Sequence, residues 1–467
     1  MRNLRFYAMA VGVAMFAAAC AGGHHDGTPV GLTDNGGAQA AGQAGPTSGG
    51  SAACQGQALT STDIGVTADT ITVEIMADTG ATNAPGMANG SVEAVKAWAK
   101  LVNSEGGLAC RQIKVQSFDS KIDPSESAAG YAKGCQSALG MVGTYALAVD
   151  DVSTLQNCKD KNGAATGLPE TAAAALNPLQ ACGKTTFLYA GNTSPCPPGR
   201  GEQTFDESSV YADFLKHILG VSTGHGMYYV VVSPPSVRDT VVPEFLYMDQ
   251  QGMKADQMTG VASATSTQAN FTPFIAKLKA DKSQFYFSTA VFSTLLQAKA
   301  EAAAQGVSDK LVWLCGATCY DKEFQKAGGA AAVGTYVAIN TLPLDESSSN
   351  AEVKTFTQNV KTQNAFSLGS WLSARLFQKA IEDLVQDKGP NALTRANVLQ
   401  ALGQVKNFDA GGMIGPITPS AHEAPNCITV LRTETDGFKR VWPAKPGTLQ
   451  CGTTGTIKVD PQTAYKG

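Results

Sequence analysis

The chain has 467 residues, of which 43% are hydrophobic and 16% charged, so it is long and apolar enough for two domains or lobes. Its 35 Lys and Arg residues against 39 Asp and Glu residues give a formal net charge of −4. This balance argues against a nucleic-acid-binding protein, which would carry an excess of basic side chains.

The first twenty residues have the pattern of an export signal. Arg2 and Arg5 precede an apolar segment, 6–19, that ends in three alanines directly before Cys20. The segment is too short to span a bilayer, so we predict that residues 1–19 are a cleaved signal peptide. A cysteine at this place resembles the bacterial lipobox, which implies that Cys20 is lipidated and anchors the chain to the cell membrane. The alternative is a plain cleaved signal with a chance cysteine.

The segment after the signal predicts a flexible linker over residues 20–57. It is rich in Gly, Ala, Ser, Thr and Gln, and it lacks the large apolar side chains that could offset the entropy of ordering it. His24 and His25 lie in this linker, and we interpret them as solvated histidines, with a metal role as the alternative.

The cysteines support export. Ten of the 11 cysteines remain when Cys20 is set aside, and an even number in an exported protein predicts disulfides. A zinc site is disfavoured because the sequence has no CxxC pair, and we predict no metal. The connectivity stays open, with these plausible local pairs: Cys110 with Cys135, Cys315 with Cys319, and Cys427 with Cys451.

Strand and helix patterns alternate from about residue 67. Apolar alternation and β-branched residues predict strands, and apolar residues at helical spacing predict helices between them. The predicted strands are 71–78, 112–119, 139–143, 185–191, 226–232, 284–290, 311–316, 334–340 and 427–433. The predicted helices are 91–107, 125–138, 208–219, 236–252, 267–282, 293–306, 350–363, 369–388 and 393–403. Repeated strand–helix units predict an α/β fold with mostly parallel sheets and two similar lobes.

Catalytic motifs are scarce. Gly220-Val-Ser222-Thr-Gly224 matches the pattern of a nucleophile elbow, but that motif needs a strand before it and a helix after it. Here a predicted helix precedes and a predicted strand follows, so a glycine-rich helix end is the favoured interpretation. The sequence contains no GxxxxGK[ST] or HExxH motif, and no GxGxxG follows the first strand. We therefore expect no cofactor and no enzyme, with a hydrolase using Ser222 as an alternative.

Ligand binding remains as the predicted activity. In open α/β sheets, ligands bind at the carboxyl ends of the strands, and two lobes can enclose a ligand between such ends. The loops expected to face the ligand are 78–86, 143–151, 168–176, 233–239, 288–294 and 315–321.

The order of several short motifs resembles a known family. A first strand, a helix ending in N-x-x-G-G, a strand ending in Asp, and Asp-Pro before the next helix occur in succession. These places are held by Asn103, Gly106, Gly107, Asp119, Asp123 and Pro124. The pattern, over roughly 67–445, is similar to type I periplasmic substrate-binding proteins, the leucine/isoleucine/valine-binding group of ABC importers.

The resemblance implies two Rossmann-like lobes joined by three crossovers and a hinge. The first lobe would comprise 67–198 and 335–425, and the second 199–334 and 426–467. It also implies reversible binding of a small molecule and its delivery to a membrane permease, without catalysis. We expect a monomer outside the cytoplasm, held to the bilayer by its N-terminal lipid, with no nucleic-acid partner.

The resemblance further implies which residues meet the ligand. Family members that take amino acids hold the α-carboxylate with first-lobe hydroxyls and amides, and a second-lobe acid often meets the ammonium. The matching positions are Thr79, Thr144, Tyr145, Ala146, Glu170 and Thr171 in the first lobe, and Arg238, Asp239 and Phe292 in the second. The alternatives are simple packing for Tyr145 and a solvated helix start for Arg238 and Asp239.

Three departures from the family pattern bear on the ligand. Tyr145-Ala146-Leu147 replaces a Ser/Thr-rich loop, Gly316-Ala317-Thr318 carries no acid, and Arg238 stands where a tyrosine is expected. Because arginine can pair with an anion through two hydrogen bonds, we expect a small polar or anionic molecule in place of a branched-chain amino acid. Open alternatives are a ligand sensor without transport and an envelope interaction protein whose cleft is filled by side chains.

Overall fold

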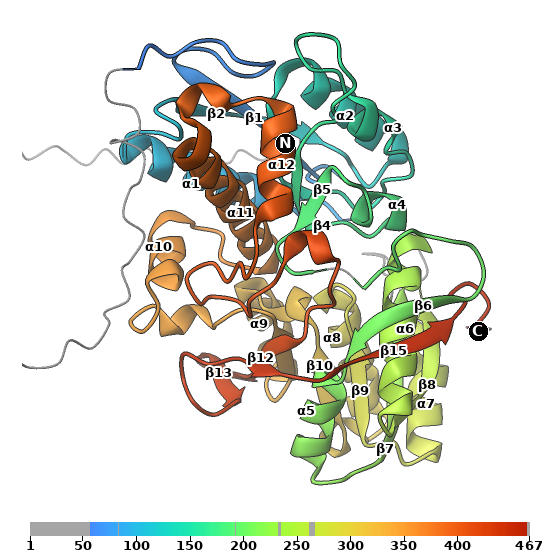
Figure 1. Cartoon of the computed structure of the whole chain (residues 1–467). Coiled ribbons are helices and arrows are strands. Elements are labelled where there is room, and N and C mark those ends of the chain that lie inside the picture. Colours follow the sequence, from blue (N-terminus) through green and yellow to red (C-terminus); the bar gives the residue numbers. More distant parts are fainter. Residues whose placement is uncertain (1–56, 83, 192, 232–234, 261–266, 465–467) are drawn as a thin grey trace, which may run out of the picture. The chain divides into compact units, whose positions relative to one another are not determined.

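Two open, mostly parallel sheets, each flanked by helices, account for most of the chain that the structure describes (Figure 1). The structure is a computed structural model and describes residues 57–82, 84–191, 193–231, 235–260 and 267–464. The predicted signal peptide, Cys20 and nearly all of the predicted linker lie outside these ranges.

The first sheet has five parallel strands in the order β2-β1-β3-β4-β5. Its strands are β1 (Thr70–Ala77), β2 (Gln112–Asp119), β3 (Gly140–Tyr145), β4 (Glu170–Ala174) and β5 (Thr186–Leu188). Its helices are α1 (Asn89–Ser104), α2 (Pro124–Ser137), α3 (Ser153–Asn157), α4 (Pro178–Ala181), α10 (Ala351–Asn359), α11 (Ala365–Lys388) and α12 (Arg395–Gln404). Helices α1 and α11 pack side by side on one face of the sheet, and α2 packs on the other.

The second sheet has the order β13-β12-β11-β10-β9-β7-β8, and β12 and β13 are antiparallel to their neighbours. Its strands are β7 (Gly224–Val231), β8 (Met253–Gly260), β9 (Phe285–Ser288), β10 (Val312–Cys315), β11 (Tyr336–Ile339), β12 (Cys427–Glu434) and β13 (Gly437–Trp442), with β14 (Gln450–Cys451) beside β12. Its helices are α5 (Val210–Leu219), α6 (Pro235–Gln250), α7 (Thr272–Ala280), α8 (Phe292–Ala304) and α9 (Lys322–Gly328). A separate antiparallel ribbon joins β6 (Gln203–Ser208) to β15 (Thr454–Val459).

The chain passes between the two sheets three times. It leaves the first sheet after β5, returns after β11, and leaves again after α12 to form β12. The second and third passages pair through a bridge between Thr341 and Ile414, and Leu342 N–H donates to the Met413 carbonyl at 2.8 Å. The sequence placed residues from 335 onward in the first lobe, but β11 pairs with β10 and β12 in the second sheet. The return therefore begins about five residues later than expected.

Local sequence explains where the principal helices begin. Asp123 caps α2, accepting hydrogen bonds from the backbone of Ser125 at 2.9 Å and Glu126 at 3.0 Å, with Pro124 in the first turn. Asn364 caps α11 and forms a reciprocal pair with Ser367. The predicted loop 168–176 is different, because its residues 170–174 form β4 between β3 and β5. Its run of alanines has low strand propensity, so the burial of β4 on both faces decided its structure.

A buried arginine fastens the start of the described chain to the first sheet. The Arg111 side chain is fully buried, and its guanidinium donates to the carbonyl oxygens of Thr60, Thr67, Ala109 and Pro390. It also donates to the side-chain oxygen of Asn391 at 3.0 Å. Burying a cation costs free energy unless such acceptors surround it, so these contacts fix residues 60–67 against the amino end of β2.

Four disulfides are defined among the described residues. Cys315–Cys319 and Cys427–Cys451 confirm two of the predicted local pairs. The predicted pairing of Cys110 with Cys135 is wrong: Cys135 bonds to Cys158, because α3 packs against α2 and brings the two Cα atoms to 5.6 Å. Cys182 bonds to Cys196, and Cys110 is also disulfide-bonded.

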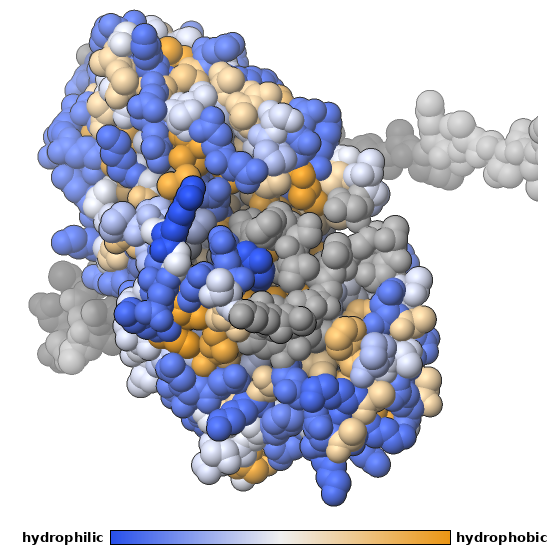
Figure 2. Space-filling view, turned by 90° about the vertical axis from the view of Figure 1, so that its right-hand side faces the viewer, coloured by the Kyte–Doolittle hydropathy of each residue, from blue (hydrophilic) through white to orange (hydrophobic). Residues whose placement is uncertain are grey.

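Hydrophobic side chains are largely enclosed in the described part of the chain. On the face shown in Figure 2, hydrophobic residues lie in small groups among hydrophilic ones. Leu179 is the one large hydrophobic side chain, among the described residues, that is exposed. No helix formed by those residues is sufficiently long and apolar to cross a bilayer.

The second lobe buries two glutamates near each other. Glu207 on β6 is 2% exposed, and its pKa is raised well above the ordinary value by burial and by the nearby charge of Glu244. Burial raises the pKa of Glu244 on α6 to about 8. One carboxyl oxygen of each residue is buried without a hydrogen-bond partner among the described residues. Burial therefore favours the protonated form of each carboxyl.

We predict that Glu244→Gln stabilises the protein in a pH-dependent way. Between the ordinary glutamate pKa of 4.5 and the folded-state value of about 8, the folded protein keeps a proton that the unfolded chain has lost. The wild-type stability should therefore fall as pH rises through this window. The neutral amide removes that loss, so the variant should gain about 3.5 kcal/mol relative to wild type between pH 5 and pH 8.

Urea unfolding at pH 5 and pH 8 measures this difference. The exposed Glu323 provides the control, because Glu323→Gln should leave the pH dependence as in wild type. An equal stability change for Glu244→Gln at both pH values would contradict the expectation.

Candidate functional site

The carboxyl ends of the two sheets approach each other, and residues that lie just beyond the strands make contacts between them. Burial raises the pKa of the Tyr189 phenol, which follows β5, and the nearby side chain of Asn340, which follows β11, acts in the opposite direction. Asn364, at the start of α11, donates to Asp321 beyond β10 at 3.1 Å. The Tyr320 hydroxyl accepts a hydrogen bond from the Leu344 backbone at 2.8 Å. The strand ends predicted to surround a ligand are thus brought together.

Asp78 organises the carboxyl edge of the first sheet. It directly follows β1, is fully buried, and accepts hydrogen bonds from the Ser120 hydroxyl at 2.7 Å, the Ile122 N–H at 2.6 Å and the Leu147 N–H at 2.8 Å. Its own N–H donates to the Tyr145 carbonyl at 3.0 Å. Burial raises the pKa of Asp78, while these donors act in the opposite direction. One carboxylate therefore links the loops that follow β1, β2 and β3.

Asp119 performs a similar role at the next strand end. Its Oδ1 atom accepts the backbone N–H groups of Thr79 and Gly80, each at 3.0 Å, and of Lys121 at 3.1 Å. These bonds lower the pKa of Asp119 despite the opposing effect of burial. A side chain at Gly80 would meet the Asp119 carboxylate at 2.2 Å, so this close approach requires glycine. Thr79, a predicted ligand residue, is thereby fixed and half-buried at the edge.

Tyr145 and Ala146 lie at the end of β3, as the predicted binding loop requires. The Tyr145 ring is partly buried and meets the edge of Phe366 on α11, with ring centroids 5.0 Å apart. Burial raises the pKa of the Tyr145 phenol, and the nearby Tyr189 and Asp78 add to that shift. Ala146 is almost completely buried. This edge therefore presents a phenol and small apolar groups.

Three predicted ligand residues do not lie in a loop at the carboxyl edge of the first sheet: Glu170, Thr144 and Thr171. Glu170 is the first residue of β4, at the amino end of the strand, and it is fully buried. It accepts hydrogen bonds from Tyr131 at 3.2 Å, Gln180 at 3.2 Å and Thr186 at 2.7 Å, and burial raises its pKa. Thr144 faces the same carboxyl group, and Thr171 is fully buried. The structure places these three residues inside the first lobe, because the segment read as a loop is a strand.

The predicted ligand residues of the second lobe lie close to strand ends, and their side chains interact with other residues of the protein. Arg238 lies in the first turns of α6, and its Nε and Nη2 atoms donate to Asp239 Oδ1 at 2.8 and 2.6 Å. Both side chains are 21% exposed, so the pair is neither free nor fully solvated. Phe292 begins α8 after β9, is partly buried, and lies 5.9 Å from the Phe324 ring.

Ser222 has the surroundings predicted for a helix end. Gly220 ends α5 in a left-handed conformation with φ of 66°, and the exposed Ser222 precedes β7. It therefore lies at the amino end of that strand. His225 contacts Ser283 and Asp256, at 3.4 and 3.8 Å. The strand–turn–helix order of a nucleophile elbow is not present here.

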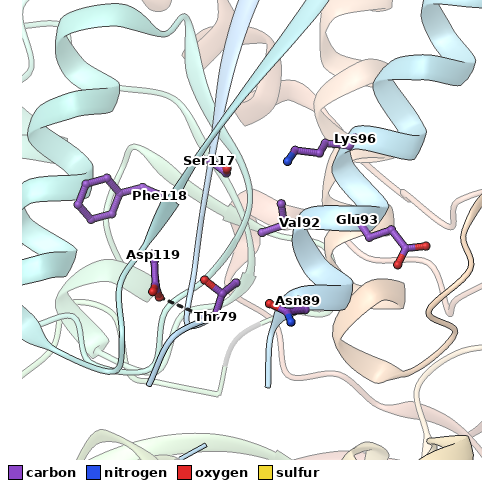
Figure 3. Close-up of a pocket in the computed structure, with 8 residues that line it drawn as sticks. All are labelled: Thr79, Asn89, Val92, Glu93, Lys96, Ser117, Phe118 and Asp119. Atoms are coloured by element: carbon purple, nitrogen blue, oxygen red, sulfur yellow. Dashed lines mark hydrogen bonds between the residues drawn. The ribbon is translucent and has the colours of Figure 1, made fainter. Parts of the chain in front are cut away.

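A groove of about 530 Å³ lies outside the predicted site, between α1 and the end of β2. Val92 and Lys96 point from α1 toward β2, whereas Glu93 and Phe118 point away from the space between them (Figure 3). Of the predicted ligand residues, Thr79 alone lines it. The groove runs along the outer edge of the first sheet, since β2 is the edge strand.

The sequence reasoning missed Asp78, Tyr189, Asn340 and Phe366 as individual site residues. Asp78, Tyr189 and Asn340 each directly follow a strand that had been predicted in part, so the strand-end rule could have selected them. Phe366 gave no such signal, because its place beside Tyr145 depends on how α11 returns to the first sheet.

The comparisons with known proteins agree with this architecture. The model of the periplasmic binding protein family matches residues 75–438. Similar solved structures include a fatty acid ABC transporter substrate-binding protein from Thermomonospora curvata, with a TM-score of 0.61, 15% identity, and coverage of 82% of this chain and 97% of that one. A search of curated proteins by sequence returns no match.

Two further structures are similar at the same level of identity. A substrate-binding protein of an ABC transporter from Aeropyrum pernix has a TM-score of 0.62 and 15% identity, covering 85% of this chain and 97% of that one. The branched-chain amino acid transporter substrate-binding protein LivJ from Streptococcus pneumoniae, in complex with isoleucine, has a TM-score of 0.58 and 14% identity, covering 84% and 100%. At these identities the likeness concerns the fold.

The fold and the joined strand ends define a type I periplasmic binding protein, which confirms the predicted fold class. The chain belongs to the periplasmic binding protein family, the substrate-binding components of ABC transporters. It is therefore a solute-binding protein and not an enzyme, and the family implies a location outside the cytoplasm and an ABC permease as partner.

We predict that Asp78→Asn loosens the loop after β3. The amide nitrogen would face a backbone or hydroxyl donor where a carboxylate oxygen now accepts, and such a loss costs about 1–3 kcal/mol. Hydrogen–deuterium exchange should accelerate in peptides covering residues 140–150. Asp123→Asn, which alters the half-buried cap of α2 on the same edge, should leave exchange there unchanged. Unchanged protection in Asp78→Asn would show that the carboxylate does not hold the loop.

Proposed function

We propose that this chain is an extracytoplasmic solute-binding lipoprotein of an ABC importer, with one small-molecule site between the carboxyl ends of its two sheets. The first lobe would comprise 67–198 and about 340–425, and the second about 199–339 and 426–467. The single observation that carries the location is the hydrogen bond from Asn364, at the start of α11, to Asp321 beyond β10 at 3.1 Å, which joins the first lobe to the strand ends of the second sheet. Parallel α/β sheets bind ligands at such ends.

The three chain passages support a hinge at this place. Tyr189 and Asn340 each begin a passage between the sheets, so a rotation between the lobes would act on the residues nearest the proposed ligand. In binding proteins, closure of two lobes around a ligand uses a few such connecting residues. We propose that the protein binds its solute as a monomer, closes by this motion and presents the solute to the permease.

The expectation of a polar or anionic ligand rested largely on Arg238. In the structure two of its donor atoms are directed at Asp239, and the pair is charge-compensated. An anion would therefore have to compete with Asp239 for the guanidinium. The hypothesis stays untested, and it has lost its main support from sequence.

We expect the purified full chain to contain or acquire one small molecule. Native mass spectrometry should detect a bound solute at 1:1 stoichiometry, and its removal should lower the unfolding temperature. Readdition at 100 times the dissociation constant should restore about 2.7 kcal/mol of stability. A chain that binds nothing and is stabilised by no fraction of a metabolite extract would contradict the proposed binding function.

We also expect Cys20 to carry the membrane anchor. Metabolic labelling with palmitate in a bacterial host should label the wild-type chain, which should fractionate with membranes. Cys20→Ser should lose both the label and the membrane association, whereas Cys54→Ser should keep both. A labelled Cys20→Ser protein, or an unlabelled wild type, would refute lipidation at this residue.

A further inference from the structure

Uncharged residues follow six of the strands whose ends surround the proposed site. The four residues that follow each of β3, β4, β5, β9, β10 and β11 contain no Lys, Arg, His, Asp or Glu. Those segments are 146–149, 175–178, 189–192, 289–292, 316–319 and 340–343. The two lobes thus contribute three uncharged ends each to the place where their sheets come together.

Five charged side chains near these ends are already engaged. Asp78 accepts three hydrogen bonds, and Asp119 accepts three backbone N–H groups. Asp321 accepts from the Glu323 backbone and from Asn364, while Arg238 and Asp239 bind each other. A zwitterion or an anion entering the site would lose its hydration without gaining an uncommitted charged partner among these residues.

Aromatic and small apolar side chains are what the same edges offer. Tyr145 is partly buried beside Phe366, and Tyr189 lies close enough to Tyr145 to influence its phenol. Ala173 and Ala174, the last two residues of β4, are half-buried. On the second lobe, the partly buried Phe292 and the half-buried Thr289 and Thr318 follow β9 and β10.

We propose that the solute is uncharged and has a flat, largely apolar body that packs on Tyr145, with hydroxyl or carbonyl groups that bond to the phenols and threonine hydroxyls around it. This inference rests on the proposed function and names the chemical class of its ligand. Aromatic rings stack on tyrosine with little loss of side-chain freedom, and neutral polar groups are satisfied by neutral partners. A site of uncharged groups discriminates against charged analogues because their charges would be buried unpaired.

Three probes with the same phenyl ring separate charge from shape. Isothermal titration of the full chain, freed of bound solute, should give a dissociation constant for 2-phenylethanol at least tenfold lower than for phenylacetate and phenylalanine. Leucine should bind no better than phenylalanine. Tighter binding of phenylacetate, phenylalanine or leucine than of 2-phenylethanol would overturn the inference and leave the proposed function intact. The same conclusion would follow if 2-phenylethanol failed to bind while a metabolite extract still protected the protein from unfolding.

Two variants locate the probe. Tyr145→Ala should weaken 2-phenylethanol binding at least tenfold, whereas Tyr145→Phe, which keeps the ring, should change it less than threefold. Tyr211→Ala is the matched control, because Tyr211 is also partly buried and lies 5.2 Å from a phenylalanine ring, that of Phe287, but on α5. Unchanged affinity in Tyr145→Ala, or an equal loss in Tyr211→Ala, would contradict the assignment. If neither the probes nor the extract affects the protein, both the inference and the proposed function fail.

Discussion

The hydrogen bonds to the buried carboxylate of Asp78 are the interactions on which the carboxyl edge of the first sheet depends. Loops that follow adjacent parallel strands have no ladder to hold them, and their N–H groups need other partners. Asp78 provides acceptors to the loops after β2 and β3 and lies itself at the end of β1. The position of Tyr145 follows from this arrangement, because its carbonyl accepts the Asp78 N–H and its neighbour Leu147 donates to the carboxylate.

The opposite edge of the same sheet is fixed by cations. Arg111 is surrounded by carbonyl oxygens of the initial segment and of the turn after α11. Arg395, also fully buried, begins α12 and donates to the carbonyls of Cys135, Ala138 and Lys159. Each guanidinium ties segments that are distant in sequence, so the first lobe is closed by charge-assisted bonds at its amino edge.

Sequence patterns were sufficient for the fold because the strands and helices that form it have strong periodicity. The helix at α1 and the strands at β1 and β2 were predicted within a few residues. The sequence patterns failed where tertiary context overrides local propensity. The alanines of β4 were interpreted as a loop, and Glu170 was assigned to the ligand within that loop. Spacing also misled the pairing of Cys135, since the partner is set by the packing of α3 on α2. Phe366 illustrates the remaining limit, because only the return of α11 brings it to Tyr145.

The distribution of ionisable groups connects the fold to the ligand. The deeply placed carboxyls of Glu74, Glu170 and Glu207 lie within the lobes, away from the strand ends that meet, and burial raises the pKa of each. A buried carboxyl is tolerated because protonation or hydrogen bonds within the protein compensate for the hydration it loses on folding. These three carboxyls therefore need no contribution from a solute. At the joined edges uncharged residues follow six strands, and the carboxyls of Asp78 and Asp119 already accept hydrogen bonds from the protein. An anion could reach the Arg238 guanidinium only in competition with Asp239, whereas an uncharged solute would leave that pair in place.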